Sequence, residues 1–158
     1  MEFDPADADL SLASLFAGWA LADELQARLA ADGFGDARFA DGVVFQHLVG
    51  GPVTISVLAE RLGVTQQAAS KSVADLEKRG YLAREADPAD ARARNVVLTQ
   101  RGQAVIAAAR KHRAAVERQL RKALGADRVE AARVLLVEVI DHLGASPSLR
   151  TRMVRPPR

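Results

Sequence analysis

The sequence has no cysteine among its 158 residues. This absence excludes disulfide bonds, thiolate metal ligands and any sensing by cysteine oxidation. Aromatic residues make up only 4% of the chain, so alanine and leucine supply most of the apolar content, which favours helices over strands. No apolar run approaches the roughly 18–20 residues of a membrane span. The acidic start MEFDPADADL lacks the basic beginning of a signal peptide. We therefore expect a cytoplasmic protein that does not associate with membranes.

The motifs of common enzyme chemistries are also missing. There is no glycine-rich phosphate loop, no HExxH sequence and no cysteine nucleophile, so we expect no catalytic residue and no cofactor. The three histidines are His47, His112 and His142. Without cysteine or a clear set of carboxylates they make a poor zinc site, and we expect no metal. The net charge of +2 is too small to indicate nucleic-acid binding, so a DNA-binding surface has to come from local arrangement.

The most informative stretch is TISVLAERLGVTQQAASKSVADLEKRGYL, which starts at Thr54. Apolar residues recur in it at three- and four-residue spacing, as they do in amphipathic helices. They are Ile55, Leu58, Ala59 and Leu62 in a first block, and Ala69, Val73 and Leu76 in a second. Thr54 and Thr65 are good N-caps, because a hydroxyl can accept from a free N–H of the first turn. Gly63 suits the positive φ at a helix end. The pattern predicts a helix-turn-helix.

The outward face of the second helix is polar at its N-terminal end. It carries Thr65, Gln66, Gln67, Ser70 and Lys71. Amide and hydroxyl groups of this length read base edges in the major groove, and a helix N-terminus favours a nearby phosphate. An ordinary solvated helix face is the alternative for these residues taken alone. The segment that follows decides between the two interpretations.

Two short β-compatible segments, 81–84 and 95–98, enclose the polar loop EADPADARAR. Arg92 and Arg94 lie in this loop, and arginines at a hairpin tip can enter a narrow minor groove. Asp90, two residues before Arg92, can hold that arginine by a bidentate pair. We expect Arg84 and Arg94 near phosphates. A surface turn with a weak ion pair is the alternative for Asp90 and Arg92.

This region resembles the MarR family of bacterial winged-helix transcriptional regulators. The wing pattern Asp-Pro-x-Asp-x-Arg, followed by Val-x-Leu-Thr-x-x-Gly, is matched by Asp87, Pro88, Asp90, Arg92, Val96, Leu98, Thr99 and Gly102. Ala91 is a departure, since many members carry a basic residue there. The resemblance implies a mainly α fold with a small β-hairpin wing, flanked by N- and C-terminal dimerisation helices. It also implies a homodimer that binds a pseudo-palindromic site on double-stranded DNA.

Helical patterns flank the motif on both sides. We expect a flexible N-terminus over residues 1–9, an N-terminal dimerisation helix within 10–35 and a winged helix-turn-helix over 36–99. A helix over about 36–48 opens that region. The C-terminal dimerisation helices fill 100–144, with Thr99 as the cap of the first and Asp127 with Glu130 as a capping box for the second. The basic tail 145–158 is expected to be disordered.

The resemblance further implies a small-molecule effector, of an aromatic or phenolic kind, bound between the dimer helices and the winged-helix lobe. The residues we expect there are Phe16, Trp19, Phe39, Phe45 and His47. Core or dimer packing is the alternative for Trp19, because aromatic residues on a helical stripe usually pack in a core.

The sequence predicts a dimeric DNA-binding transcriptional regulator, a repressor that leaves its operator when the effector binds. The rival hypothesis is a winged helix used as a protein-interaction module without sequence-specific DNA binding. The wing separates the two, because a protein-binding module has no need for Arg92 and Arg94 at its tip.

Overall fold

The computed structural model describes residues 7–87 and 94–145. Its helices are α1 (Leu10–Leu29), α2 (Asp41–Leu48), α3 (Ile55–Leu62), α4 (Gln66–Lys78), α5 (Gln100–Leu124) and α6 (Ala126–His142). A π-helical turn, η2 (Ala30–Phe34), follows α1 directly. The strands are β1 (Val53–Thr54), β2 (Leu82–Ala86) and β3 (Arg94–Leu98). The expected fold class, mainly helical with a small sheet, is confirmed.

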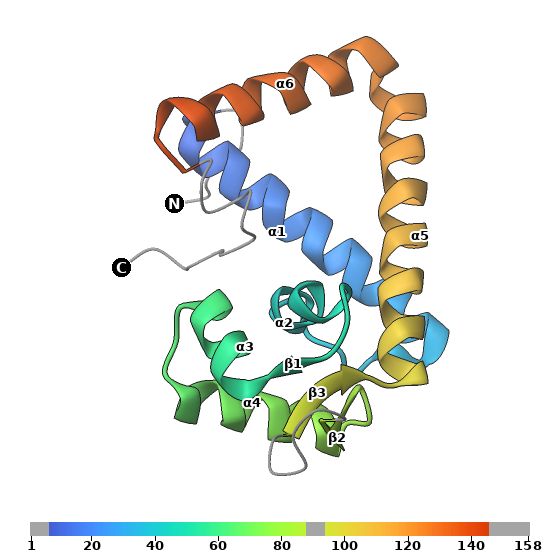
Figure 1. Cartoon of the computed structure of the whole chain (residues 1–158). Coiled ribbons are helices and arrows are strands. Elements are labelled where there is room, and N and C mark those ends of the chain that lie inside the picture. The colour runs from blue at the N-terminus through green and yellow to red at the C-terminus, as the bar shows by residue number, and fades with distance from the viewer. Residues whose placement is uncertain (1–6, 88–93, 146–158) are drawn as a thin grey trace, which may run out of the picture.

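A small antiparallel sheet and helices α2, α3 and α4 form one lobe at the bottom of Figure 1. The strand order is β1-β3-β2. Val53 pairs with Val96 across β1 and β3, and Leu82 pairs with Leu98 across β2 and β3. The expected hairpin, formed by β2 and β3, is therefore present. The two-residue strand β1, which the sequence did not predict, pairs with the other edge of β3.

The core of this lobe lies where α2, α3 and α4 meet the sheet. Its largest fully buried side chains are Tyr81, Leu58, Leu76, Val73 and Val96. Leu58, Val73, Leu76 and Val96 come from positions where the apolar spacing of a helix or strand turns them inward, and burying each stabilises the lobe by about 1.5–3 kcal/mol. The buried faces of α3 and α4 thus fix which side of each helix remains outside.

The remaining helices form an open frame above the lobe (Figure 1). Helix α5 rises from the end of β3, α6 folds back from its far end, and α1 packs against α5. No residue of α6 is buried, and apolar side chains of α1 and α6 are exposed in the single chain. They include Leu12, Leu15, Trp19, Leu21, Leu135, Leu136 and Leu143. No helix among the described residues is long and apolar enough to cross a membrane.

The helix starts follow the expected caps with two exceptions. Thr54, Thr65 and Thr99 accept hydrogen bonds from the backbone N–H groups of Val57, Ala68 and Gly102, respectively, as predicted. The capping box at α6 is wrong, since no side chain caps this helix and Glu130 instead pairs with Arg121 and Arg133. Helix α2 begins at Asp41 rather than near residue 36, because the Arg38 N–H donates to the Asp41 side chain and the Asp36 carbonyl oxygen accepts from Arg79 instead of a helical N–H.

Candidate nucleic-acid interface

Helix α4 divides cleanly into a buried and an exposed face. Ala69, Val73 and Leu76 are buried against the lobe core, whereas Gln66, Gln67 and Lys71 are exposed. The exposed polar side chains therefore lie together at the N-terminal end, as their spacing predicts. No acidic residue occurs in α4 before Asp75, so this end combines a positive helix dipole with a lysine and two amides.

Two members of the predicted set make contacts of their own. Thr65 is exposed, but its hydroxyl already accepts from the Ala68 N–H at 3.1 Å, so it acts first as the helix cap. Ser70 is half-buried, and the Arg84 guanidinium lies 3.5 Å from both its hydroxyl and its carbonyl oxygen. Their place beside the exposed amides agrees with the predicted surface, although their side chains are less free than the sequence suggests.

Of the three arginines predicted in and beside the wing, the structure describes Arg84 and Arg94. Arg84 on β2 lies against α4, where it also pairs with Glu77 at 3.5 Å, so this side chain braces the wing on the helix. Arg94 opens β3 opposite Ala86 and is exposed. Asp90 and Arg92 lie outside the described residues. The described base of the wing is closed by the Asn95 side-chain amide, which donates to the Asp87 carboxylate at 3.1 Å.

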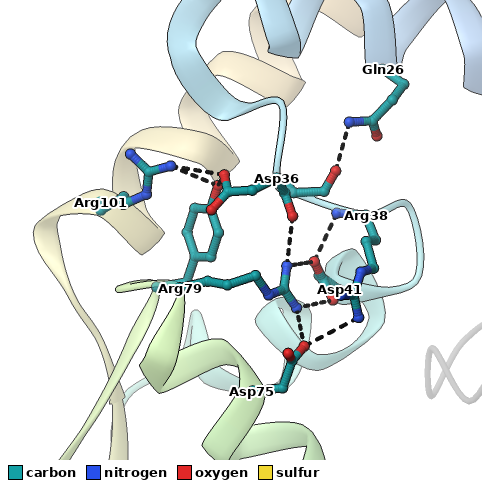
Figure 2. Close-up of polar contacts among 9 residues, drawn as sticks. Gln26, Asp36, Arg38, Asp41, Asp75, Arg79 and Arg101 are labelled. Carbon is teal, nitrogen blue, oxygen red and sulfur yellow. Dashed lines mark hydrogen bonds and ion pairs between the residues drawn. The ribbon is translucent and has the colours of Figure 1, made fainter.

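The sequence did not predict a polar network at the C-terminal end of α4. Figure 2 shows Arg79, the C-cap residue of α4, between two carboxylates. Its guanidinium donates to both oxygens of Asp41, at 2.6 and 3.0 Å, and to Asp75 at 2.6 Å. It also donates to the carbonyl oxygen of Asp36 at 2.8 Å. In the sequence Arg79 follows Lys78, and the pair looks like an ordinary basic helix end. The four-residue spacing of Asp75 and Arg79 was the available signal.

A second part of the network joins Tyr81, the residue just before β2, and Arg101 of α5 to Asp36. The hydroxyl of Tyr81 donates to the Asp36 carboxylate at 2.5 Å, and Arg101 donates to the same oxygen at 2.8 Å. The Arg101 guanidinium also lies over the Tyr81 ring, 4.8 Å from its centroid. The hydrogen bond from Tyr81, together with the Arg101 guanidinium, lowers the pKa of Asp36 below its ordinary value. The carboxylate therefore stays charged in the folded protein.

Comparison with known families finds a match for this lobe. A sequence model of the MarR family matches residues 43–93, which run from within α2 through α3, α4 and β2.

Over these residues the chain matches the MarR family.

The matched family is one of transcription regulators, in agreement with the expectation that the chain is no enzyme. A comparison with curated proteins finds no match.

Solved structures with the same winged-helix fold cover nearly the whole chain. The transcriptional repressor CouR, bound to a 23-mer DNA duplex, is 24% identical with a TM-score of 0.63, over 88% of this chain and 97% of that one. Streptococcus pneumoniae FabT, in complex with DNA, is 20% identical with a TM-score of 0.64, over 85% and 94%. A MarR-like regulator from Thermotoga maritima is 22% identical with a TM-score of 0.64, over 87% and 98%. These likenesses extend the shared fold to the flanking helices α1, α5 and α6.

The five residues predicted for an effector pocket do not gather in the structure. Phe16 and Trp19 of α1 make a tilted ring contact with centroids 5.6 Å apart, and Trp19 is 57% exposed. Phe45 is buried in the lobe core against Tyr81, and Phe39 is 71% exposed before α2. His47 is half-buried on α2. The single chain therefore places them in different surroundings, and their role in effector binding stays a prediction.

A hollow of about 330 Å³ lies instead between the lobe and α5. Its lining is mainly apolar, with two polar side chains from α5. Residues that line it include Leu48, Pro52, Leu98, Gln103, Ile106 and Arg110. Among the described residues no group of three or more His, Asp and Glu side chains could hold a metal ion. His112 instead pairs with Asp32, with 2.7 Å between Nε2 and the carboxylate.

The network makes Tyr81 a reporter of the folded lobe. Burial, and after it the hydrogen bond to Asp36, raises the pKa of Tyr81 to about 12, from an ordinary value near 10. We expect absorbance at the phenolate band to titrate near pH 12 in the folded chain and near pH 10 in denaturant. Because the raised pKa favours the neutral phenol, its stabilising contribution is complete below pH ~10 and is lost as the pH rises towards 12.

Tyr81 is the one tyrosine of the chain, so the signal needs no deconvolution. The single tryptophan does not ionise and serves as the internal reference. A midpoint near 10 in the folded chain, with helicity intact, would contradict the buried contact between Tyr81 and Asp36.

Proposed function

We propose that the chain is a dimeric DNA-binding transcriptional regulator that represses by occupying a pseudo-palindromic operator. The observation that carries this proposal is the face of α4: Gln66, Gln67 and Lys71 are exposed beside the helix N-terminus, while the opposite face is buried. Side chains of this kind read base edges when a helix enters the major groove. The relatives CouR and FabT were solved with DNA, and CouR is described as a transcriptional repressor.

Dimerisation is supported by the surface of α1 and α6. Trp19, Leu135 and Leu143 leave large apolar areas exposed in the single chain, and α6 buries no residue at all. Contiguous apolar patches of this kind mark interaction surfaces. A two-fold dimer would cover them with equivalent residues of a second copy and would present two α4 helices to one duplex.

Selection from a random duplex pool, at two salt concentrations, tests this function. We expect an enriched inverted repeat with half-site centres about 10 base pairs apart. Retention that disappears at moderate salt without an enriched motif would show electrostatic attraction only. The winged helix would then be better understood as a protein-interaction module.

Gln67→Ala is expected to weaken binding to the selected duplex by about tenfold. A side chain that reads a base contributes about 1–3 kcal/mol of discrimination, so preference at one position of each half-site should also relax. Fluorescence anisotropy at constant salt measures the affinity, and repeated selection measures the preference. Gln46→Ala is the matched control, because Gln46 is equally exposed on α2 outside the reading face. Equal effects of the two substitutions would remove Gln67 from the reading surface.

Effector release extends the proposal. The hollow beside α5 lies between the lobe and the proposed dimer arms, by which we mean helices α1, α5 and α6. Arg110 of α5 places a cation in its lining. A small aromatic or phenolic compound bound there would favour one arrangement of lobe and arm, and so shift the dimer away from the spacing that fits DNA. The selected duplex provides the test: a panel of aromatic acids and phenols should contain compounds that raise Tm and release the duplex. A panel in which none does either would refute effector control by this class.

A further inference from the structure

The connector 35–40, between η2 and α2, and the first residue of α2, Asp41, are bound by elements from both halves of the molecule. From α1, the Gln26 side-chain amide donates to the carbonyl oxygen of Ala37 at 2.6 Å. From the end of α4, Arg79 binds Asp36 and Asp41, and from α5, Arg101 binds Asp36. Figure 2 shows these groups converging on one short segment. The connector is therefore the place where α1 and α5, which belong to the proposed dimer arms, are joined by hydrogen bonds and ion pairs to α4, the proposed reading helix.

Arg79 fixes the angle of α4 relative to the connector. The Arg79 and Asp41 side chains are only 12% and 10% exposed, and their pairing is bidentate. The same Asp41 oxygen that faces Arg79 Nη1 also accepts from the Arg38 N–H at 2.7 Å, so the carboxylate itself is fixed. A planar guanidinium fork on a fixed carboxylate specifies direction as well as distance. Apolar contacts such as those of Val73 and Leu76 are not directional.

The Arg79–Asp41 ion pair, which we call the clamp, lies at the end of α4 farthest from its exposed amides. A small change in the angle of α4 at the clamp therefore moves those amides by a large distance. Arg79 caps the C-terminal end of α4, whereas the exposed amides lie at the other end, roughly 18 Å away along the helix. A tilt of about 5° at the clamp would move the reading end by about 1.5 Å. That displacement is enough to spoil a bidentate hydrogen bond to a base edge, whose length varies by only a few tenths of an ångström.

We propose that Arg79 is a specificity-determining positioning residue that fixes the angle of each reading helix on the dimer arms. Through that angle it sets the half-site spacing that the dimer accepts. Arg79 does this without touching DNA, because its side chain is nearly buried and both terminal nitrogens are engaged by Asp36, Asp41 and Asp75. This inference rests on the proposed function, and goes beyond it by naming the residue that determines spacing.

Arg79→Lys is the main test, because lysine keeps the charge but lacks the planar fork. Affinity is measured for the selected duplex and for duplexes with one base pair added or removed between half-sites. We expect the wild type to discriminate by tenfold or more, and Arg79→Lys to bind the best duplex about tenfold more weakly with its spacing preference reduced to about threefold or less. The slope of log affinity against log salt should stay unchanged, because no phosphate contact is lost. Arg113→Lys, the same change at an exposed position of α5, is the matched control.

A second readout needs no DNA. The chain has no cysteine, so Ala68→Cys gives one spin-label site per protomer at the exposed, reading end of α4. The distance distribution between the two labels of a dimer should be narrow in the wild-type background and broader with Arg79→Lys. Arg79→Gln with Asp41→Asn provides a further variant that leaves no unpaired buried charge, in case the lysine variant does not fold.

The outcomes are distinguishable. A folded, dimeric Arg79 variant that keeps both the spacing preference and the narrow distance distribution overturns the inference. A salt slope reduced by about one would make Arg79 a phosphate contact and would overturn it as well. If the wild type selects no inverted repeat, the proposed function fails, and the role of Arg79 in half-site spacing fails with it. The distances between the spin labels would still show whether Arg79 fixes the angle of α4.

Discussion

Gly102→Ala is expected to destabilise the winged-helix lobe by about 3 kcal/mol or more and to lower Tm by about 10 °C. A β-carbon at position 102 would lie 2.2 Å from the carbonyl oxygen of Tyr81 and 3.1 Å from Leu98 Cδ2. The carbonyl cannot move aside easily, because it accepts from the Thr99 N–H and hydroxyl at 3.1 and 3.0 Å. Overpacking against backbone therefore displaces the first turn of α5 from β2.

Gly42→Ala is the matched control for this experiment. Gly42 lies in α2 of the same lobe, its φ is not positive, and an added β-carbon would meet nothing within 4 Å. Alanine there should be neutral or stabilise by about 0.5–1 kcal/mol, because the unfolded chain loses freedom. Thermal unfolding followed by circular dichroism compares the two. A Gly102→Ala variant that melts within 2 °C of the wild type would show that α5 does not approach β2 so closely.

Leu135→Asp is expected to convert the proposed dimer into a monomer and to reduce operator affinity at least a hundredfold. Leu135 is 48% exposed at the middle of α6, among neighbours that are also apolar and exposed. In a two-fold interface each substitution counts twice, so the loss of two buried leucines costs about 3–6 kcal/mol of association before any desolvation of the carboxylates. A monomer also loses the avidity of two linked reading heads, which is worth roughly 10²–10⁴.

Light scattering at micromolar concentration measures the mass, and anisotropy with the selected duplex measures the affinity. Val49→Asp is the control, since Val49 is 46% exposed at the end of α2, where it lines the hollow beside α5 and is not part of the apolar surface of α1 and α6. It should remain dimeric. A Leu135→Asp protein that also stays dimeric would show that this part of α6 lies outside the interface.

The features that the sequence determined are those fixed by near neighbours in the chain. The caps Thr54, Thr65 and Thr99 follow from residue type and a hydrogen bond to an N–H three residues later. The buried faces of α3 and α4 follow from three- and four-residue spacing, which is also why the exposed amides of α4 were placed correctly. The family resemblance used these same local signals.

Local signals failed where a partner distant in sequence decided the outcome. Strand β1 has only two residues and exists because Val53 and Thr54 pair with Val96 and Asn95 of β3. The expected capping box at α6 did not form, because Arg121 of the preceding helix and Arg133 both compete for Glu130. In each case the local preference was weaker than a contact that the fold supplied.

Arg79 illustrates the same limit within the candidate site. In the sequence it is one of two basic residues at a helix end, a place where cations are usually solvated. Only the tertiary structure brings Asp41 and the connector, nearly forty residues earlier in the chain, against it. Sequence alone therefore determined which face of α4 is presented, because helical periodicity is local. The tertiary structure decided how that helix is held, because the groups that hold it meet only when α1, α4 and α5 pack around one connector.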